Sequence, residues 1–381
     1  MVFSLAACGG GNASTPAPET TTPAESGAPA ETTPATDMKV AMITDYGDIT
    51  DQSFNQTTYE ACNEFCTANS VDFTYYKPAG DSTAERVAMV DAAVAEGYNV
   101  VVMPGYAFAE TIKETAEMYP DVTFIALDVG ESDLGADYTV PSNVYCAVYQ
   151  EELCGYMAGY AAVKLGYTHL GFLGGMAVPA VQRYGYGFVQ GADAAAADLG
   201  NGADVTVEYV YGNQFFGDAD ITAYMDNWYQ TQGVEVVFAC GGGIYTSAAE
   251  AAAKVGGKVI GVDVDQAAII DAYGEGMTVT SAMKGLANTT KHLLQEVMDG
   301  NFANYGGQIE TLGLVSGDDP TANYVQLPME STQWSDSFTQ DDYKAMVAGM
   351  YDGTITVSND VSVAAADYAT VITVNEYGNI K

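Results

Sequence analysis

Short apolar runs alternate with stretches of helical periodicity from Met38 onward. A run of this kind predicts a strand, and apolar residues three or four apart predict the helix that follows. Ser82 and Glu85 form a capping box at the start of one such helix. The strands expected in this first series are Lys39–Thr44, Val71–Tyr76, Asn99–Met103 and Val122–Leu127. Continuous apolar strands separated by helices are typical of a parallel sheet covered on both faces.

A second series of the same kind follows an expected helix over Glu151–Leu165. Its expected strands are Leu170–Leu173, Val205–Tyr209, Val234–Ala239 and Lys258–Val262. Beyond Thr280 the pattern predicts a helix over Leu286–Met298, strands over Ile309–Val315 and Tyr324–Leu327, a helix over Asp341–Met350 and a strand over Gly353–Val357. Two series predict two doubly wound α/β lobes, and the later elements indicate that the chain crosses between them again.

The chain length agrees with two lobes, since 381 residues suffice for roughly two domains. We expect lobe I to comprise residues 38–166, with 281–305 returning to it. Lobe II is expected to comprise residues 167–280, with 306–381 returning to it. No run approaches the ~18–20 consecutive apolar residues of a membrane-spanning helix.

The N-terminal segment has the form of a lipoprotein signal followed by a tether. Leu5-Ala6-Ala7-Cys8 resembles a lipobox, and residues 9–37 are rich in Pro, Thr and Ala. Such a spacer buries too little apolar surface to fold, so it is expected to be disordered. Chance could produce Leu-Ala-Ala-Cys in an Ala-rich chain, but the position and the spacer favour lipidation of Cys8. Only seven residues precede Cys8, so residues 1–8 are interpreted as a signal-peptide remnant whose true start is missing or misassigned.

The charge balance excludes one class of partner. Twelve Lys and Arg stand against fifty Asp and Glu, which gives a net charge of −38. Such a surface repels nucleic acid polymers and anionic lipid at long range, and it disfavours a highly anionic ligand. The simplest interpretation of the charge is an acidic, soluble coat.

Cysteine and histidine usage gives little support for a metal site or nucleophilic catalysis. The chain has six Cys and two His, His169 and His292, so buried thiols are favoured over a zinc site for five of the cysteines. Gly241-Gly242-Gly243 lacks the Lys and Ser/Thr of a P-loop. Asp263 and Asp265 could serve acid–base chemistry, but strand-end acids are more simply acceptors for ligand hydroxyls.

Polar, glycine and aromatic residues gather after the expected strands, where open α/β sheets bind ligands. The first series contributes Asp45, Gly105, Tyr106, Phe108 and Asp128, and the second contributes Gly241, Gly242, Gly243, Asp263 and Asp265. Each alone has a plainer interpretation as a helix cap, a turn residue or packing. Together they predict a cleft that collects side chains from both lobes.

Several of these segments resemble motifs of the basic membrane protein family, which includes purine-nucleoside receptors of ABC transporters. The similar segments are Ile43–Gln56 with its Ser-Phe-Asn-Gln, Tyr156–Ala162, Gly171–Gly175, Gly185–Gly191 and Ile260–Gln266 with its Gly-Val-Asp-Val-Asp-Gln. The resemblance extends from about Met38 to Asp299, and the Gly353–Val357 ending is similar too.

This resemblance implies a type I periplasmic-binding-protein fold with a nucleoside between the lobes. Phe54 would stack on the base and Asn55 would hydrogen-bond its edge. Asp45 and Asp128 would accept from base nitrogens. The remaining expected contacts are Asp263 and Lys284 to the ribose hydroxyls beside Gly241 and Gly242, Phe238 as a second stacking face, and Tyr106 and Phe108 at one end of the pocket.

The resemblance also implies partners and a location. The protein would be extracytoplasmic, anchored through Cys8, and would deliver its ligand to the permease subunits of an ABC importer without a cofactor or catalytic residue. Two alternatives stay open: another small ligand, such as a sugar or an autoinducer-like molecule, in the same fold, or a nucleoside-processing hydrolase. Pro104–Glu110 departs from the family pattern, so the base preference is undecided.

Overall fold

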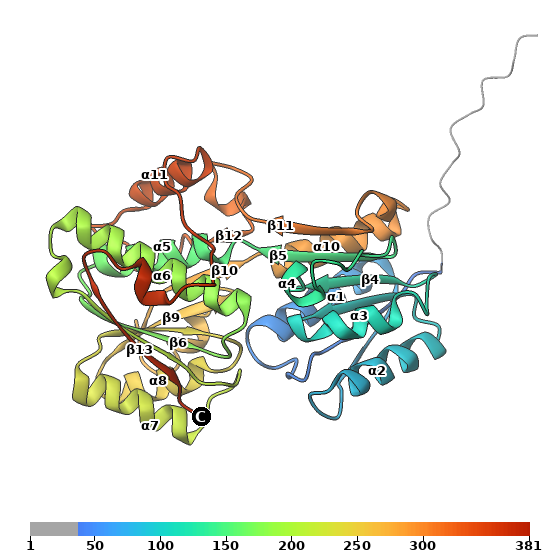
Figure 1. Ribbon diagram of the computed structural model, residues 1–381, viewed down its shortest axis with the longest axis horizontal. Coiled ribbons are helices and arrows are strands. Elements are labelled where there is room, and N and C mark those ends of the chain that lie inside the picture. Colours follow the sequence, from blue (N-terminus) through green and yellow to red (C-terminus); the bar gives the residue numbers. More distant parts are fainter. Residues whose placement is uncertain (1–36) are drawn as a thin grey trace, which may run out of the picture. The chain divides into compact units, whose positions relative to one another are not determined.

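The computed structural model describes residues 37–381 and contains two sheets covered by helices on both faces (Figure 1). Cys8 and residues 9–36 of the expected tether lie outside the described residues. No helix within residues 37–381 is long and apolar enough to cross a membrane. The two-lobed α/β architecture expected from the pattern is confirmed.

The first sheet has six strands in the order β11-β5-β4-β3-β1-β2, and every pairing in it is parallel. Its strands are β1 (Lys39–Ile43), β2 (Asp72–Tyr76), β3 (Val100–Pro104), β4 (Thr123–Leu127), β5 (Val144–Tyr149) and β11 (Gln308–Leu312). Its helices are α1 (Phe54–Asn69), α2 (Thr83–Ala95), α3 (Ala109–Thr115), α4 (Glu131–Leu134) and α10 (Leu286–Met298). The Ser82 side chain caps α2 by accepting from the Glu85 amide, as the capping box predicts.

The second sheet has seven strands in the order β12-β10-β9-β8-β6-β7-β13. Its strands are β6 (His169–Gly174), β7 (Thr206–Tyr211), β8 (Val236–Cys240), β9 (Lys258–Asp263), β10 (Thr278–Lys284), the antiparallel β12 (Val325–Gln326) and β13 (Thr373–Asn379). Its helices are α5 (Glu151–Lys164), α6 (Pro179–Leu199), α7 (Ala219–Asn227), α8 (Tyr245–Ala253), α9 (Ala267–Ile270) and α11 (Gln340–Tyr351).

The chain crosses between the sheets three times, after β5, after β10 and after β11. The expected lobe boundaries therefore need correction. Helix α5 packs along α6 and belongs with lobe II, so the first crossing falls near residue 150 instead of 166. The segment that returns to lobe I is 286–312, because α10 packs on α1 and β11 pairs with β5.

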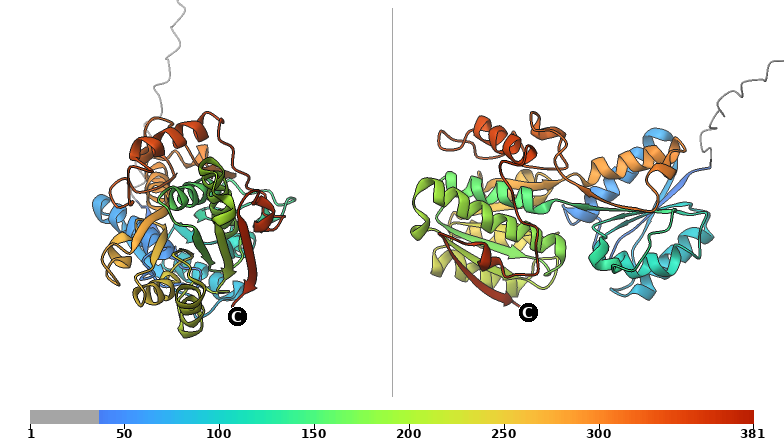
Figure 2. Two further views of the ribbon diagram at one scale, coloured as in Figure 1. Left: turned by 90° about the vertical axis from the view of Figure 1, so that its left-hand side faces the viewer. Right: turned by 45° about the horizontal axis from the view of Figure 1, so that its top comes forward.

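The C-terminal segment differs from the sequence pattern in two ways. Gly353–Val357 was expected as a strand but forms turns and extended chain without a sheet partner. Instead β13 pairs in parallel with β7. In Figure 2 it is the dark-red strand along the edge of the second sheet. The mostly exposed, polar residues of β13 carry little hydrophobic signal, which explains why the pattern does not reveal it.

Glycines bring α5 and α6 unusually close together. A Cβ atom at Gly155 or Gly159 of α5 would collide with carbonyl oxygens of α6. A Cβ atom at Gly187 or Gly191 of α6 would likewise collide with carbonyl oxygens of α5. Each helix thus has two glycines four residues apart on the contact face, the spacing that lets two helix backbones approach closely. The close contact between α5 and α6 holds the first turns of both helices beside the ligand cleft.

Candidate ligand-binding site

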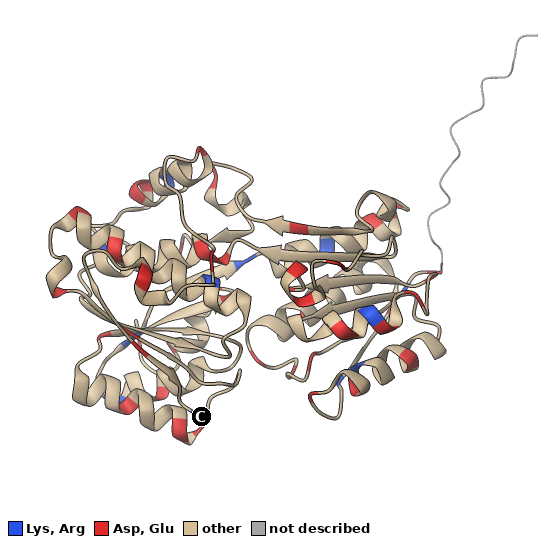
Figure 3. Cartoon of the chain, in the orientation of Figure 1, with Lys and Arg blue, Asp and Glu red and all other residues tan. Residues whose placement is uncertain are grey.

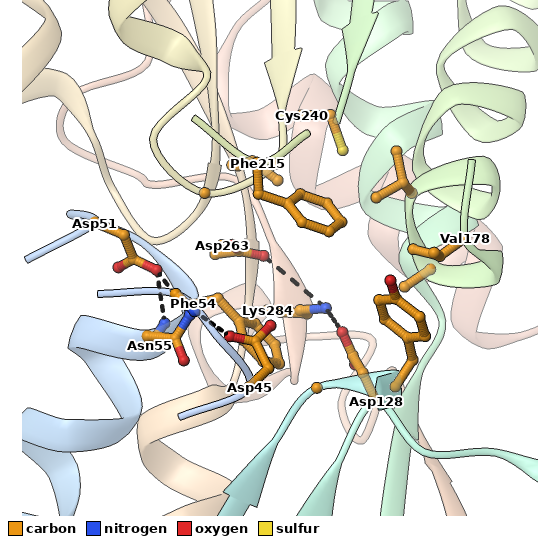
Figure 4. Close-up of a pocket in the computed structure, with 18 of the residues that line it drawn as sticks. Asp45, Asp51, Phe54, Asn55, Asp128, Val178, Phe215, Cys240, Asp263 and Lys284 are labelled. Carbon is orange, nitrogen blue, oxygen red and sulfur yellow. Dashed lines mark hydrogen bonds and ion pairs between the residues drawn. The ribbon is translucent and has the colours of Figure 1, made fainter. Parts of the chain in front are cut away.

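A cleft of about 820 Å³ opens at the carboxyl ends of the strands of both sheets (Figure 4). Nine of the eleven ligand-binding residues predicted from the sequence line it. They are Asp45, Phe54, Asn55, Tyr106, Asp128, Gly241, Gly242, Asp263 and Lys284. Its volume lies within the range of roughly 300–1,000 Å³ usual for small-molecule sites.

Phe108 and Phe238 do not line the cleft, which corrects two predicted positions. Phe108 is fully buried in the core of lobe I, beneath the Arg86 guanidinium. Phe238 is fully buried within β8, where it packs edge to face on Phe172 and Tyr184. A parallel strand is buried on both faces, so its sequence does not distinguish an aromatic residue in the core from one that lines the cleft.

Lys284 stands at the centre of the cleft within a group of carboxylates. Its Nζ lies 2.5 Å from Asp128 Oδ2, 3.3 Å from Glu151 Oε1 and 3.9 Å from Asp263 Oδ1. Only 2% of the Lys284 side chain is exposed. Burial opposes the charged form of this amine, but Asp128, Glu151 and Asp263 outweigh burial and raise the pKa of Lys284. The ammonium is therefore charged at neutral pH.

Asp128 and Asp263 hold equivalent places in the two lobes. Asp128 follows β4 and Asp263 ends β9, and both have left-handed backbone conformations, with φ of 58° and 67°. Such conformations are uncommon outside glycine and often occur at functional sites. Burial raises the pKa of Asp128 to about 6 and also raises that of Asp263, in both cases against the effect of Lys284.

Asp45, Asp51 and Asn55 form the opposite end of the cleft. Asp45 Oδ1 accepts from the backbone amides of Tyr46 and Gly47, both at 2.7 Å. Asp51 accepts from the backbone and side-chain nitrogens of Asn55 at 2.9 and 3.2 Å. Asn55 Oδ1 is buried without a hydrogen-bond partner among residues 37–381, and so is Asp128 Oδ1. One buried oxygen beside Asp51 and one beside Lys284 are thus left to accept a hydrogen bond from a ligand.

Residues 38–319 match the family described as "ABC transporter substrate-binding protein PnrA-like". The chain belongs to this family. The ABC transporter nucleoside-binding protein BmpA of Lactococcus lactis subsp. cremoris is 27% identical over 300 residues, which cover 74% of this chain and 80% of that protein. Basic membrane protein B of Borreliella afzelii is 25% identical over 287 residues, with coverages of 74% and 79%.

Solved structures share the fold of this family member. An ABC transporter solute-binding protein from Aeropyrum pernix superposes with a TM-score of 0.64 and 22% identity, and covers 84% of this chain and 87% of that one. One from Conexibacter woesei has the same TM-score and identity, with coverages of 84% and 99%. The expected periplasmic-binding-protein architecture is thereby confirmed.

The two lobes of this family member touch across the cleft. Ser53 Oγ of lobe I donates to Asp263 Oδ2 at 2.5 Å, and Gln266 Nε2 of lobe II donates to the Gln52 carbonyl oxygen at 3.0 Å. The Tyr46 hydroxyl also lies 3.4 Å from the sulfur of Met176 in lobe II. The Ser-Phe-Asn-Gln and Gly-Val-Asp-Val-Asp-Gln motifs that carry the family resemblance therefore meet at the site.

Sequence reasoning gave no ligand-binding role to Phe215, Glu151 or Arg183, which the structure places at the site. Phe215, in the loop after β7, lines the cleft, and its ring rests against Gly175 and Gly241, where a side chain would collide with it. Figure 4 shows Phe215 reaching into the cleft from the side opposite Asp45 and Asn55. Glu151, fully buried at the start of α5, accepts from Arg183 Nε at 2.7 Å as well as from Lys284. No motif or spacing marks these residues, because the tertiary contacts alone bring them together.

The described residues that line the cleft supply hydrogen-bond acceptors and aromatic rings. Neither His169 nor His292 lines it. Asp265, which could have formed a carboxylate pair with Asp263, lies outside the cleft and accepts from Ser331 Oγ at 2.7 Å. What the arrangement can do chemically is hold a neutral polar molecule through hydrogen bonds and ring contacts.

Proposed function

We propose that this chain binds a nucleoside, with a purine as the expected base, and delivers it to the permease of an ABC importer. The observation that carries the proposal is the arrangement of Phe54, Asn55 and Asp45 at one end of the cleft and Asp263 and Lys284 at its centre. A nucleoside has the matching parts: a flat base with polar edges and a sugar with vicinal hydroxyls.

Phe54 and Phe215 are the proposed stacking residues for the base. They come from different lobes, and both line the cleft. Aromatic faces suit either side of a planar heterocycle, and stacking of this kind contributes about 1–3 kcal/mol per base. Phe215 thus replaces Phe238 as the second face. Asn55 and Asp45 supply an acceptor and a carboxylate for the edge of the base.

Asp263 and Lys284 are the proposed ribose contacts. Lys284 Nζ is 3.9 Å from Asp263 Oδ1, so a hydroxyl beside both groups could donate to the carboxylate and accept from the ammonium. The three cations that line the cleft, Lys77, Arg183 and Lys284, are already paired with carboxylates. A phosphate would lack a free cation, so an uncharged nucleoside is favoured over a nucleotide.

A binding screen with the full chain tests the proposal. Nucleosides, free bases, nucleotides and sugars are compared by thermal shift and then by calorimetric titration. Binding to the native state alone raises the melting temperature by mass action, so purine nucleosides should give the largest shifts. Phe54→Ala and Phe215→Ala should each weaken nucleoside binding by at least about 5-fold. Tyr351→Ala, which removes an aromatic ring that is 53% exposed, is the control. Sugar binding without nucleoside binding would contradict the proposal.

Absence of turnover is a second part of the proposal. The relatives are substrate-binding proteins, and the described cleft holds no nucleophile paired with a base. Nucleoside incubated with saturating protein should be recovered intact. Release of free base and ribose beyond one equivalent would favour a hydrolase.

The proposed location is extracytoplasmic, with the protein anchored by lipid on Cys8. The lipobox-like run before a Pro- and Thr-rich spacer supports this proposal. Mass spectrometry of protein extracted from native membranes should find an acylated Cys8. An unmodified peptide spanning Ala7–Gly9 would contradict it.

A further inference from the structure

The cleft extends beyond the groups assigned to the base and ribose into a recess beside the crossing strands. Six residues define this recess: Gly130, Val148, Val178, Ala180, Val181 and Ile309. Val148 lies on β5 and Ile309 on the neighbouring β11, on the same face of the first sheet. Val178, the N-cap residue of α6, and Ala180 and Val181 in the first turn of that helix line the same cleft from lobe II. The recess is therefore an apolar space shared by the two lobes.

The contacts between the lobes argue against further closure as the way in which this space is filled. The lobes already touch at Ser53–Asp263 and at Gln52–Gln266, with distances of 2.5 and 3.0 Å. The recess also lies beside β5 and β11, after which the chain crosses between lobes, and a hinge rotation moves atoms least near its axis. At about 820 Å³ the cleft is near the upper end for small-molecule sites, so an unsubstituted nucleoside leaves part of it vacant.

The recess adjoins the sugar end of the proposed ligand. Gly130 is two residues beyond Asp128, whose carboxylate lies 2.5 Å from Lys284 Nζ. Figure 4 shows Val178 and Asp128 on one side of Lys284, and Asp45 and Asn55 on the other. When the base lies at Asn55 and the ring hydroxyls lie at Asp263 and Lys284, the 5′ carbon is the position of the sugar left facing the recess.

The side chains at the recess favour a neutral, apolar group over an anion. Most of its wall is aliphatic, and Thr311 beside Val148 adds one hydroxyl. The Arg183 guanidinium at the cleft is held by Glu151 at 2.7 Å. Glu131 and Asp133 stand at its edge, and Asp133 Oδ2 accepts from the Gly130 amide at 2.9 Å. A phosphate there would meet carboxylates and no free cation.

We infer that the preferred ligands are nucleosides with a compact, uncharged apolar substituent at the 5′ position, such as an alkylthio group. This inference rests on the proposed nucleoside function. A methyl-sized group transferred from water into the recess should strengthen binding by about 4-fold.

Calorimetric titration of the full chain with adenosine, guanosine, their 5′-deoxy-5′-methylthio analogues and adenosine 5′-monophosphate tests the inference. The analogue of the better-bound nucleoside should bind about 4-fold more tightly than its parent, and the monophosphate far more weakly. Ala180→Phe should fill the recess and weaken the analogue at least about 10-fold, with the parent nucleoside within about 2-fold. Ala197→Phe makes the same change at an exposed position of α6 and should alter neither affinity.

Gly130→Ala provides a second, smaller obstruction. Its backbone φ of −116° admits any residue, and the added Cβ would lie 3.2 Å from Val148 Cγ1. It should also weaken the analogue more than the parent. Parent nucleosides that bind while their analogues bind more weakly would overturn the inference and leave the proposed function intact. Binding of neither set would overturn both.

Discussion

Asp263 has a left-handed backbone conformation, and its carboxylate contacts two neighbouring side chains. Ser53 Oγ donates to it, and Lys284 Nζ lies 3.9 Å away. Asparagine tolerates the same backbone conformation, so Asp263→Asn removes the charge without forcing the turn to change. This makes it a sharper substitution than alanine for testing the ribose contact.

Asp263→Asn should weaken nucleoside binding while leaving free-base binding unchanged. Losing a hydrogen bond to a charged group costs roughly 1.5–3 kcal/mol, or about a 10- to 150-fold increase in Kd. Paired titrations with a nucleoside and its free base measure the difference. Phe54→Ala is the comparison, because it should weaken both ligands. Equal losses for nucleoside and base in Asp263→Asn would show that the ribose assignment is wrong.

The buried carboxyl of Glu152 should make the stability of the protein depend on pH. Burial, together with the negative charge of the adjacent Glu151, raises its pKa from 4.5 to about 7. Because the pKa of Glu152 is higher in the folded state than in the unfolded state, its contribution to stability is fully present below pH 4.5. That contribution is lost as the pH rises through 7. Glu152→Gln should remove this dependence, so the mutant should gain roughly 2–3 kcal/mol over wild type between pH 5 and 8.

Chemical denaturation of the ligand-free protein at pH 5, 6, 7 and 8 measures this gain. Glu114→Gln alters an exposed glutamate and controls for the change in net charge. A difference between wild type and Glu152→Gln that stays constant with pH would contradict the prediction.

At the scale of elements, the contact between α5 and α6 depends on four glycines. A Cβ at Gly191 would collide with the Tyr156 carbonyl oxygen, which belongs to the rigid backbone of α5. Gly191→Ala should therefore destabilise the protein by about 3 kcal/mol or more, although alanine is the better helix former. It should also weaken ligand binding, because the pair positions Glu151 and Arg183. Thermal unfolding and titration measure the two effects.

Gly80→Ala is the matched control for this substitution. The atom nearest to its Cβ would be Glu85 Oε2 at 3.0 Å, the end of a flexible side chain that can move aside. Its melting temperature should stay close to that of wild type. A Gly191→Ala variant as stable as Gly80→Ala would show that the helices can separate at little cost.

The elements differ in how far the sequence reveals them. Strands buried on both faces, such as β3 and β9, are largely apolar runs, and the acids at the carboxyl ends of β1, β4 and β9 follow from that pattern. The edge strand β13 has no such run, since most of its residues are exposed. Phe215 lies in a loop whose conformation is set by contacts with Gly175 and Gly241, far away in the chain. Local periodicity carries no information about such contacts.

At the scale of the whole molecule, like charges oppose folding. Fifty acidic residues stand against twelve basic ones, and Figure 3 shows the acidic residues spread over both lobes of the described chain. Screening of this repulsion by salt should stabilise the native state. The buried contacts of Lys284 should respond little, because solvent ions do not reach them.

The melting temperature should rise between 10 and 300 mM NaCl. A gain of about 1 kcal/mol corresponds to roughly 1–2 °C for a chain of this length, because the unfolding entropy is about 2 cal/mol/K per residue. Tetramethylammonium chloride should give the same rise if screening is the cause. A rise with sodium alone would indicate cation binding, and an unchanged melting temperature would contradict the prediction.

The three crossings of the chain also determine when each lobe can be completed during biosynthesis. Strand β11 is the outermost member of the first sheet, and α10 covers α1, yet both emerge from the ribosome only after β6 to β10. A nascent chain that ends near residue 280 therefore has most of its first sheet but leaves the apolar face of α1 uncovered. The first lobe can therefore be completed only after β6 to β10 of the second lobe have been synthesised. Until then the unfinished chain exposes apolar surface, which favours aggregation.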